Sequence, residues 1–546
     1  MNTQFTLQAN LVDLHRREIY HAEVRIKNGR IQAIRPLPGT GTHYLMPGFV
    51  DAHVHIESSM LIPVEFGRMA VVHGTVGTIS DPHEIANVLG EEGVLYMLDS
   101  AAQTPLKICF GVPSCVPATN FETAGANMGP DIVERLLGRP DTYYLSEMMN
   151  FPGVVHDVPE VMAKLAAAKR IGKPIDGHAP GLRGQDAVKY FGEGIMTDHE
   201  CFTYEEGLEK ARLGVKILIR EGSAARNFEA LIGLLPDFPD QIMFCSDDKH
   251  PDDLVRGHIN QLAARAVAAD CDLFDVLRAA CLHPVEHYRM PVGLLREGDP
   301  ADFILVEDLR EFRVLKTWID GELVAEEGKS LSPHRSSGAP NQFNTAAKKP
   351  EDFKVVGKSG TVRVIRALDG EIVTESETAP FPTGGMSDAG TDLLKIAVVN
   401  RYRTAPPALG YIRGFGLKTG AIASCVAHDS HNIVAVGVTD EALCRAVNEV
   451  IRNRGGIAAT DGEAAWSLAL PVAGIMSPGD GYEVARQYAE VDAVVKSRLG
   501  CALKAPFMAL SFMALPVIPK LKMTDRGLFD VEEFGFSEVF LVVGGN

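Results

Sequence analysis

Two histidines separated by a single residue, His53 and His55, end an apolar run near the start of the chain. Alternate side chains of an extended strand point to the same side, so both imidazoles would project together while Val54 packs behind them. One metal ion could then bind both rings. Because two core histidines at this spacing occur often by chance, the pair needs further ligands before it indicates a metal site.

Four more side chains of the ligand type stand at the ends of later apolar runs: Glu147, His178, His199 and Asp247. Six imidazole and carboxylate groups suffice for two adjacent divalent metal ions that keep open positions for water. Ligation without thiolate suits manganese, iron or zinc, and affinity alone would favour zinc. The set predicts a metal-dependent hydrolase.

The elements that must position these ligands are eight candidate strands, each followed by a helix-like segment. They cover residues 48–53, 77–80, 107–112, 143–147, 174–178, 194–199, 216–221 and 241–247. This alternation predicts an α/β fold, a TIM-like (β/α)8 barrel. Because the chemistry of such barrels sits at the C-terminal ends of the strands, the ligand side chains should converge on one mouth.

The rest of the chain is predicted to form two further units. Alternating strands, turns and the hairpin signal Asn28-Gly29 indicate a small composite β-sandwich built from the segments before and after the barrel. In the last unit, strands at 361–373 and 394–399 and an amphipathic helix at 441–453 indicate an α+β domain. The expected domains are 1–47 and 291–330 for the sandwich, 48–290 for the barrel, 331–352 for a linker and 353–546 for the C-terminal domain.

Composition excludes several classes of partner. Of 546 residues, 71 are acidic and 53 basic, and a net charge of -18 argues against binding a nucleic-acid backbone. Nine cysteines without a CxxC pair suit reduced thiols in the cytoplasm. The longest apolar stretch, 502–519, is interrupted by Lys504, Pro506 and Pro516, so we expect buried core and no membrane span.

The order of the predicted ligands along the chain and the sequence of residues 46–55 resemble those of the amidohydrolase superfamily. Within it, the chain is similar to the bacterial adenine deaminase family over nearly its whole length. The similarity lies in 53–60, 80–84, 176–181, 197–200, 245–251 and the C-terminal domain. The resemblance implies two divalent metal ions, manganese or iron, and a homodimer. Many binuclear relatives bridge their metals with a carbamylated lysine after the fourth strand, and here Glu147 stands at that point.

The implied activity is hydrolytic deamination of adenine to hypoxanthine and ammonia in purine salvage, by a metal-activated hydroxide that attacks C6. The adduct needs a proton on N1 and another on the leaving amine. Asp247 could act as base as well as ligand. We predict a catalytic or substrate-binding role for His83. Its neighbours have structural explanations, since Asp81 can be the N-cap of a helix and Glu84 can close a capping box, whereas His83 has no such explanation.

Glu221 and Ser223 follow the seventh strand, where they would face the bound purine. Glu221 could hold the ring edge and supply the N1 proton. An ion pair with Arg220 or Arg226 at the rim explains Glu221 equally well. Asp248, after the eighth strand, could orient a ligand histidine or cap the loop.

The run His428-Asp429-Ser430-His431 in the last domain invites interpretation as a Ser-His-Asp triad, but contiguous side chains rarely converge in that way. We expect a turn with capping side chains. The alternative is a lid that reaches the barrel mouth and touches metal or substrate.

Two other functions compete with adenine deamination. A cyclic-amide hydrolase, similar to hydantoinases or dihydroorotases, would use nearly the same metal chemistry, and substrate screening separates the two. A barrel that has lost catalysis and serves as a scaffold would normally lack some ligands, whereas all six candidates are present here.

Overall fold

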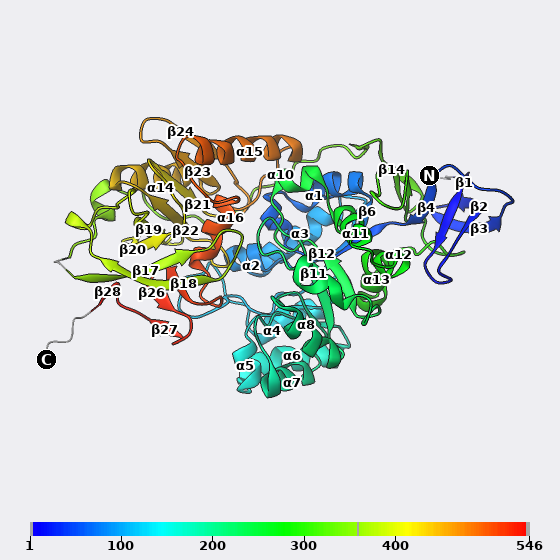
Figure 1. Cartoon of the computed structure of the whole chain (residues 1–546), viewed down its shortest axis with the longest axis horizontal. Helices are drawn as coiled ribbons and strands as arrows, with labels where there is room; N and C mark the ends of the chain where they lie inside the picture. Colours follow the sequence, from blue (N-terminus) through cyan, green and yellow to red (C-terminus); the bar gives the residue numbers. More distant parts are fainter. Residues whose placement is uncertain (1–3, 358–359, 542–546) are drawn as a thin grey trace.

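The computed structural model describes residues 4–357 and 360–541 (Figure 1). Its central domain is a ring of eight short parallel strands. Hydrogen-bonded ladders join β5–β6–β7, β8–β9 and β10–β11–β12. A bridge from Val112 to Leu145, a hydrogen bond from Met196 N to Ile175 O and a bridge from Val54 to Asp247 close the ring. The strands are β5 (Phe49–Val54), β6 (Thr75–Ser80), β7 (Lys107–Phe110), β8 (Leu145–Met148), β9 (Ile175–Gly177), β10 (Thr197–Asp198), β11 (Lys216–Arg220) and β12 (Ile242–Cys245).

Each of the eight candidate strands overlaps one of these strands. β5, β6 and β12 are buried along their whole length, as parallel strands covered on both faces must be. The helices between and after them are α1 (Pro63–Ala70), α2 (His83–Leu89), α3 (Glu91–Ala101), α4 (Pro130–Leu137), α5 (Phe151–Val155), α6 (Pro159–Ile171), α7 (Gly184–Gly192), α8 (Tyr204–Arg212), α9 (Phe228–Leu231), α10 (Pro251–Arg256), α11 (Ile259–Ala268), α12 (Leu273–Leu277) and α13 (His283–Tyr288).

The segments before and after the barrel share one sheet. Its hydrogen-bonded order is β16-β15-β14-β13-β4-β1-β2-β3, so the two segments meet where β4 pairs with β13. The eight strands are therefore hydrogen-bonded in one continuous order, whereas the sequence suggested a composite β-sandwich. The strands are β1 (Gln4–Asp13), β2 (Glu18–Lys27), β3 (Arg30–Pro36), β4 (Tyr44–Pro47), β13 (Phe303–Val306), β14 (Val314–Ile319), β15 (Glu322–Glu326) and β16 (Lys329–Ser330).

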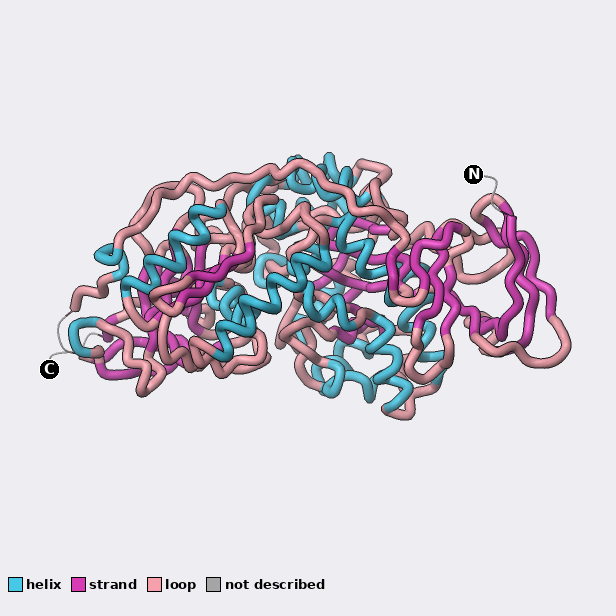
Figure 2. The backbone as a smooth tube through the Cα atoms, turned by 90° about the horizontal axis from the view of Figure 1, so that it is seen from above, coloured by secondary structure: helices cyan, strands magenta, loops and turns pink. Residues whose placement is uncertain are grey.

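The C-terminal domain lies on the opposite side of the barrel from this sheet (Figures 1 and 2). Its main sheet runs β18-β17-β20-β19-β22-β21-β23-β24, with β28 beside β17. These strands are β17 (Thr361–Ala367), β18 (Thr374–Pro380), β19 (Leu394–Val399), β20 (Ala408–Arg413), β21 (Ala421–Ser424), β22 (Ile433–Gly437), β23 (Ile457–Thr460), β24 (Ala465–Leu468) and β28 (Phe540–Leu541). The other elements are α14 (Asp440–Asn453), α15 (Gly481–Ser497), α16 (Pro506–Ser511), β25 (Leu521–Thr524), β26 (Gly527–Asp530) and β27 (Gly535–Phe536).

The connection between barrel and C-terminal domain has no helix or strand from 331 to 349. It is nevertheless anchored at both ends, because His334 Nδ1 lies 2.8 Å from Glu65 Oε1 and Asn344 N donates to the carbonyl of Arg401. The nine cysteines are free thiols. Within the described ranges, no helix is both long and apolar enough to cross a membrane.

Candidate active site

The His-x-His pair lies at the end of β5 with both rings buried. His53 Nε2 is 3.1 Å from His55 Nε2, and Asp247 Oδ1 is 3.7 Å from the first nitrogen and 3.4 Å from the second. Asp247 stands beside the pair because its backbone N–H donates to the carbonyl of His53 across the closing strands. Two imidazole nitrogens that face each other and a carboxylate suit a shared cation, which accepts all three lone pairs.

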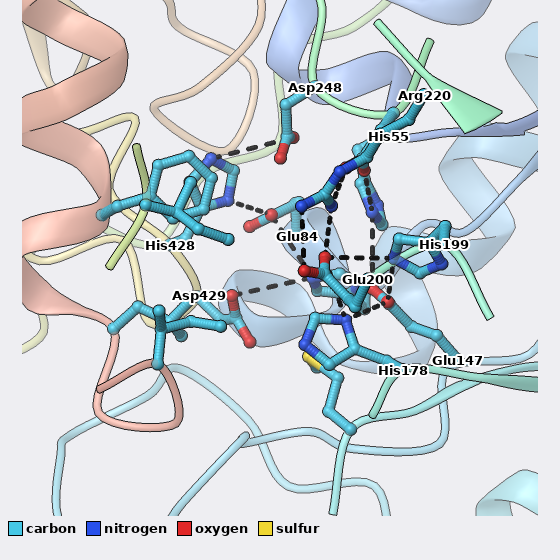
Figure 3. A pocket seen from close by; sticks show the side chains of 17 residues that line it. His55, Glu84, Glu147, His178, His199, Glu200, Arg220, Asp248, His428 and Asp429 are labelled. Atoms are coloured by element: carbon cyan, nitrogen blue, oxygen red, sulfur yellow. Dashed lines mark hydrogen bonds and ion pairs between the residues drawn. The ribbon is translucent and has the colours of Figure 1, made fainter. Parts of the chain in front are cut away.

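Glu147 links this pair to a second one. Its Oε2 is 2.7 Å from His178 Nδ1 and 3.0 Å from His199 Nε2, while its Oε1 is 3.4 Å from His55 Nε2 (Figure 3). Burial alone would raise the pKa of Glu147, yet the surrounding imidazoles lower it well below its usual value. An ionised carboxylate between two pairs of imidazoles has the position that a bridging metal ligand requires.

All six predicted ligands lie in this one cluster. Ligand atoms within 4.8 Å of one another include the groups His53–His55–Asp247, His53–Glu147–His199 and His178–His199–Glu200. His178 Nε2 is also buried without a hydrogen-bond partner among the described residues. The donors and their grouping therefore fit two adjacent divalent cations.

Groups behind the ligands hold the strand ends in place. Asp51 accepts from the backbone N–H of Ser246 at 3.0 Å and lies 2.8 Å from His258 Nε2. Tyr288 Oη donates to Asp176 at 2.8 Å, and burial raises the pKa of Asp176 to about 7. Such contacts fix the strands from which the ligands project.

A buried arginine that the sequence interpretation missed crosses the cluster. Arg220 ends β11 and donates to Asp247 Oδ2 at 2.6 Å and to Glu200 Oε2 at 2.9 Å. Glu200 directly follows the predicted ligand His199 and also lines the pocket. Burial disfavours the charged form of Arg220, and the carboxylates of Glu200 and Asp247 offset this cost.

The predicted substrate residues Glu221 and Ser223 lie outside the pocket. Arg220 points into the barrel, so Glu221, one residue later, points outward and pairs with Arg265 at 2.8 Å. Ser223 Oγ donates to Asp253 at 2.5 Å and accepts from the backbone N–H of His250 at 2.9 Å. Neither side chain lines the pocket: Glu221 forms an ion pair at its rim and Ser223 holds a loop, so their contacts with a purine stay predictions.

His83 lies at the centre of the mouth, but the capping box expected around it does not form. α2 begins at His83 with Pro82 as N-cap, and Asp81 Oδ2 is 3.0 Å from His83 Nδ1 instead of capping the helix. The same nitrogen is 3.4 Å from Glu147 Oε1. Glu84 turns away from the helix start toward the C-terminal domain, so its predicted capping role was wrong.

Glu84 joins the barrel to the run 428–431. One of its oxygens contacts His428 Nδ1 and the other contacts His431 Nε2. Asp429 Oδ1 lies 3.7 Å from His83 Nε2. The alternative interpretation, a segment that reaches the barrel mouth, therefore describes this run better than a turn with capping side chains.

The C-terminal domain also provides an apolar wall that the sequence interpretation did not place at the site. Its members come from the loop before β18, from the 3-10 turn after α16 and from the loop before β25: Ile372, Phe512, Leu515 and Ile518. Met149 continues the wall from the barrel side. A pocket with charged groups on one side and apolar side chains on the other suits a flat, partly polar ligand.

Comparison with known proteins gives two family matches and many similar chains. Residues 44–324 match the amidohydrolase family, and residues 371–535 match the adenine deaminase C-terminal domain. The chain is 56% identical to the adenine deaminase of Sulfurovum sp. (strain NBC37-1), over 97% of this chain and 98% of that protein. It is 53% identical to the adenine deaminase of Salinibacter ruber, over 99% and 100%, and 53% identical to that of Methanosarcina acetivorans, over 97% and 98%.

Proposed function

The chain belongs to the adenine deaminase family of the amidohydrolases, and we propose that it hydrolyses adenine to hypoxanthine and ammonia in purine salvage. One observation carries the proposal: both matched regions contribute side chains to a single pocket. The cluster of ligand-type residues comes from 44–324, and the apolar wall comes from 371–535. A cyclic-amide hydrolase or an inactive scaffold has no such observation in its favour.

We assign the six clustered residues to two divalent metal ions, manganese or iron, with Glu147 as the bridging ligand. Ions held there would supply water activated for attack at neutral pH. Support comes from the facing imidazoles and from the position of Glu147 between the two pairs. The assigned ligands are His53, His55, Glu147, His178, His199 and Asp247.

Deamination of adenine moves both protons of the attacking water. The water gives up one proton as it adds to C6 and the other as its oxygen becomes the carbonyl of hypoxanthine. N1 gains one proton, and the amino group gains the other before it leaves as ammonia. Asp247 accepts the proton of the water, because its Oδ1 faces the histidine pair while Arg220 holds its Oδ2. His83 delivers a proton to the leaving amine, since its hydrogen bond with Asp81 fixes the orientation of its ring.

Glu200 takes the place that the sequence suggested for Glu221. Arg220 contacts both of its carboxylate oxygens, and Glu200 lines the pocket. A carboxylate held at the ring edge accepts a hydrogen bond from N1–H and so favours the protonated form of N1 that the adduct needs.

The test is release of ammonia from adenine by protein loaded with manganese or with iron, alongside ring opening of hydantoin and dihydroorotate. Deamination of adenine supports the proposal. An inert adenine together with an opened cyclic amide would transfer the function to the second candidate, and a metal-saturated protein inactive on all three would favour the scaffold.

We also propose a homodimer in the cytoplasm. The nine free thiols suit a reducing compartment, and closed dimers are the commonest assembly of soluble enzymes. Sedimentation at several protein concentrations tests the assembly state.

A further inference from the structure

A histidine of the C-terminal domain and a carboxylate of the barrel, neither of them among the six predicted ligands, both line the pocket. His428 Nε2 and Asp248 Oδ1 are 3.8 Å apart, which is too long for a hydrogen bond (Figure 3). The nitrogen is buried and has no hydrogen-bond partner in the part of the chain that the structure describes. Both residues line the pocket. A buried polar atom without a partner at a pocket wall indicates a contact made by the ligand.

Both side chains are held in fixed orientations. Glu84 contacts His428 Nδ1, and the His428 ring stacks on Phe512 with the ring centres 4.6 Å apart and the planes inclined by 21°. Asp248 Oδ1 accepts a hydrogen bond from Ser58 Oγ at 2.5 Å. Preoriented groups of this kind lose little conformational freedom when a ligand binds.

The surroundings also define which group donates. An oxygen of Asp248 lies 3.8 Å from His428 Nε2 across the gap, so a donated N–H is favoured at that nitrogen and a lone pair is disfavoured. Asp248 offers carboxylate oxygens as acceptors. The wall therefore presents a donor and an acceptor side by side.

Adenine has the complementary pattern on the edge opposite C6. There N3 is an acceptor and the adjacent N9–H is a donor, so C6 can face the ligand cluster while this edge faces His428 of the C-terminal domain and Asp248 of the barrel. We propose that His428 donates to N3 and that Asp248 accepts from N9–H, which selects the free base over purines substituted at N9. The inference rests on adenine as the substrate proposed above.

Purine analogues that lack one of these groups test each contact separately. 3-Deazaadenine has no acceptor at position 3, and 9-methyladenine has no N9–H. Leaving a buried partner unpaired should make the wild-type protein prefer adenine over 3-deazaadenine by about 10- to 100-fold in kcat/KM. The informative variants are His428→Leu and Asp248→Ala. Phe507→Leu is the matched control, because Phe507 is buried in the same domain at α16 but lies outside the pocket.

In His428→Leu the preference for adenine over 3-deazaadenine should fall to within about 3-fold, because the lost contact no longer distinguishes the two bases. Asp248→Ala should lose the preference over 9-methyladenine in the same way. Phe507→Leu should keep both preferences, whatever its stability. A merely structural role for His428 would lower both rates and leave their ratio unchanged, and that result would overturn the inference.

Binding to metal-free protein separates this inference from the proposed function, because adenine is not turned over there. Calorimetry should give a dissociation constant for adenine that is about 10-fold or more below that for 3-deazaadenine in the wild-type protein and equal to it in His428→Leu. If the metal-loaded protein releases no ammonia while this binding pattern holds, the contact stands and the proposed reaction fails. Equal binding of both bases by the wild-type protein refutes the contact.

Discussion

Lys522 gives a quantitative test of how the C-terminal wall is built. It lies fully buried on β25, and its Nζ donates to the carbonyl oxygens of Ile372 at 2.8 Å and Phe512 at 2.9 Å. Both of these residues line the pocket. Burial lowers the pKa of Lys522 from its ordinary value of 10.5 to about 7. Replacement by methionine removes the amine and keeps the length of the side chain.

The pKa fixes the direction of the pH effect. Between about pH 7 and 10.5 the unfolded chain binds the lysine proton and the folded chain does not, so the stability that depends on Lys522 rises with pH across this window. Below pH 7 both states carry the proton, and the full cost of the buried charge is present. At about 1.4 kcal/mol per pH unit, the window of about 3.5 units corresponds to at most about 5 kcal/mol.

Thermal unfolding of wild type and Lys522→Met from pH 6 to 10 measures this difference. Relative to the variant, the wild-type Tm should increase with pH, by as much as about 10 °C for a domain of this size. Lys395→Met is the control, because Lys395 is equally buried but has Asp440 as an ionic partner. Removing it leaves Asp440 unpaired and should lower the Tm across the pH range. A difference between wild type and Lys522→Met that is flat from pH 7 to 10 would refute the reasoning.

Three further predictions concern the carboxylates of the mouth. Glu147→Gln should lose metal, measured by elemental analysis, and at least about 100-fold in ammonia release; a variant with full metal and full rate would remove Glu147 as the bridge. Glu84→Gln weakens both histidine contacts to the C-terminal domain, so KM for adenine should rise about 10-fold and exceed the change in kcat; an unchanged KM would contradict that role. Glu221→Gln should stay within about 3-fold of wild-type kcat/KM, since Glu221 pairs with Arg265 outside the pocket; a loss of about 100-fold would restore it to the substrate.

The ligand cluster could be predicted because it follows from local patterns and one topological rule. Most of the apolar runs carried a polar residue at the end, and parallel strands in a barrel bring those ends to one mouth. The strand ends at His53, Glu147, His178 and Asp247 needed no knowledge of long-range contacts. The same patterns located the C-terminal strands and helix, which appear as β17, β19 and α14.

Which residue at the end of β11 reaches the pocket depends on a single position along the strand. At the end of β11 the choice between Arg220 and Glu221 depends on which face points inward, and side chains in a strand alternate with every residue. The local sequence does not reveal that Arg220 can be buried, because the two carboxylates that neutralise it, on Glu200 and Asp247, follow other strands. The favourable pairing exists only once the barrel is closed.

The role of Glu84 could not be read from local sequence for a related reason. Three residues after Asp81, a glutamate fits a capping box, and its actual partners, His428 and His431, stand more than three hundred positions away. A capping hydrogen bond at the start of α2 competes with His428 and His431 for the carboxylate of Glu84, and the two histidines bind it. The apolar run 502–519 was correctly expected to be buried, but its position over the site is likewise a property of domain packing.

This packing gives the C-terminal domain a physical role in the proposed reaction. The mouth of the barrel holds several carboxylates and imidazoles, and their interactions with a developing charge are weak when water fills the space between them. Phe512, Leu515 and Ile518 line the pocket from the C-terminal domain, where their apolar side chains would exclude water from a bound purine. Glu84 has two roles in this arrangement. It fixes His428 at the pocket wall, and it anchors the C-terminal domain, which carries the apolar side chains that line the pocket.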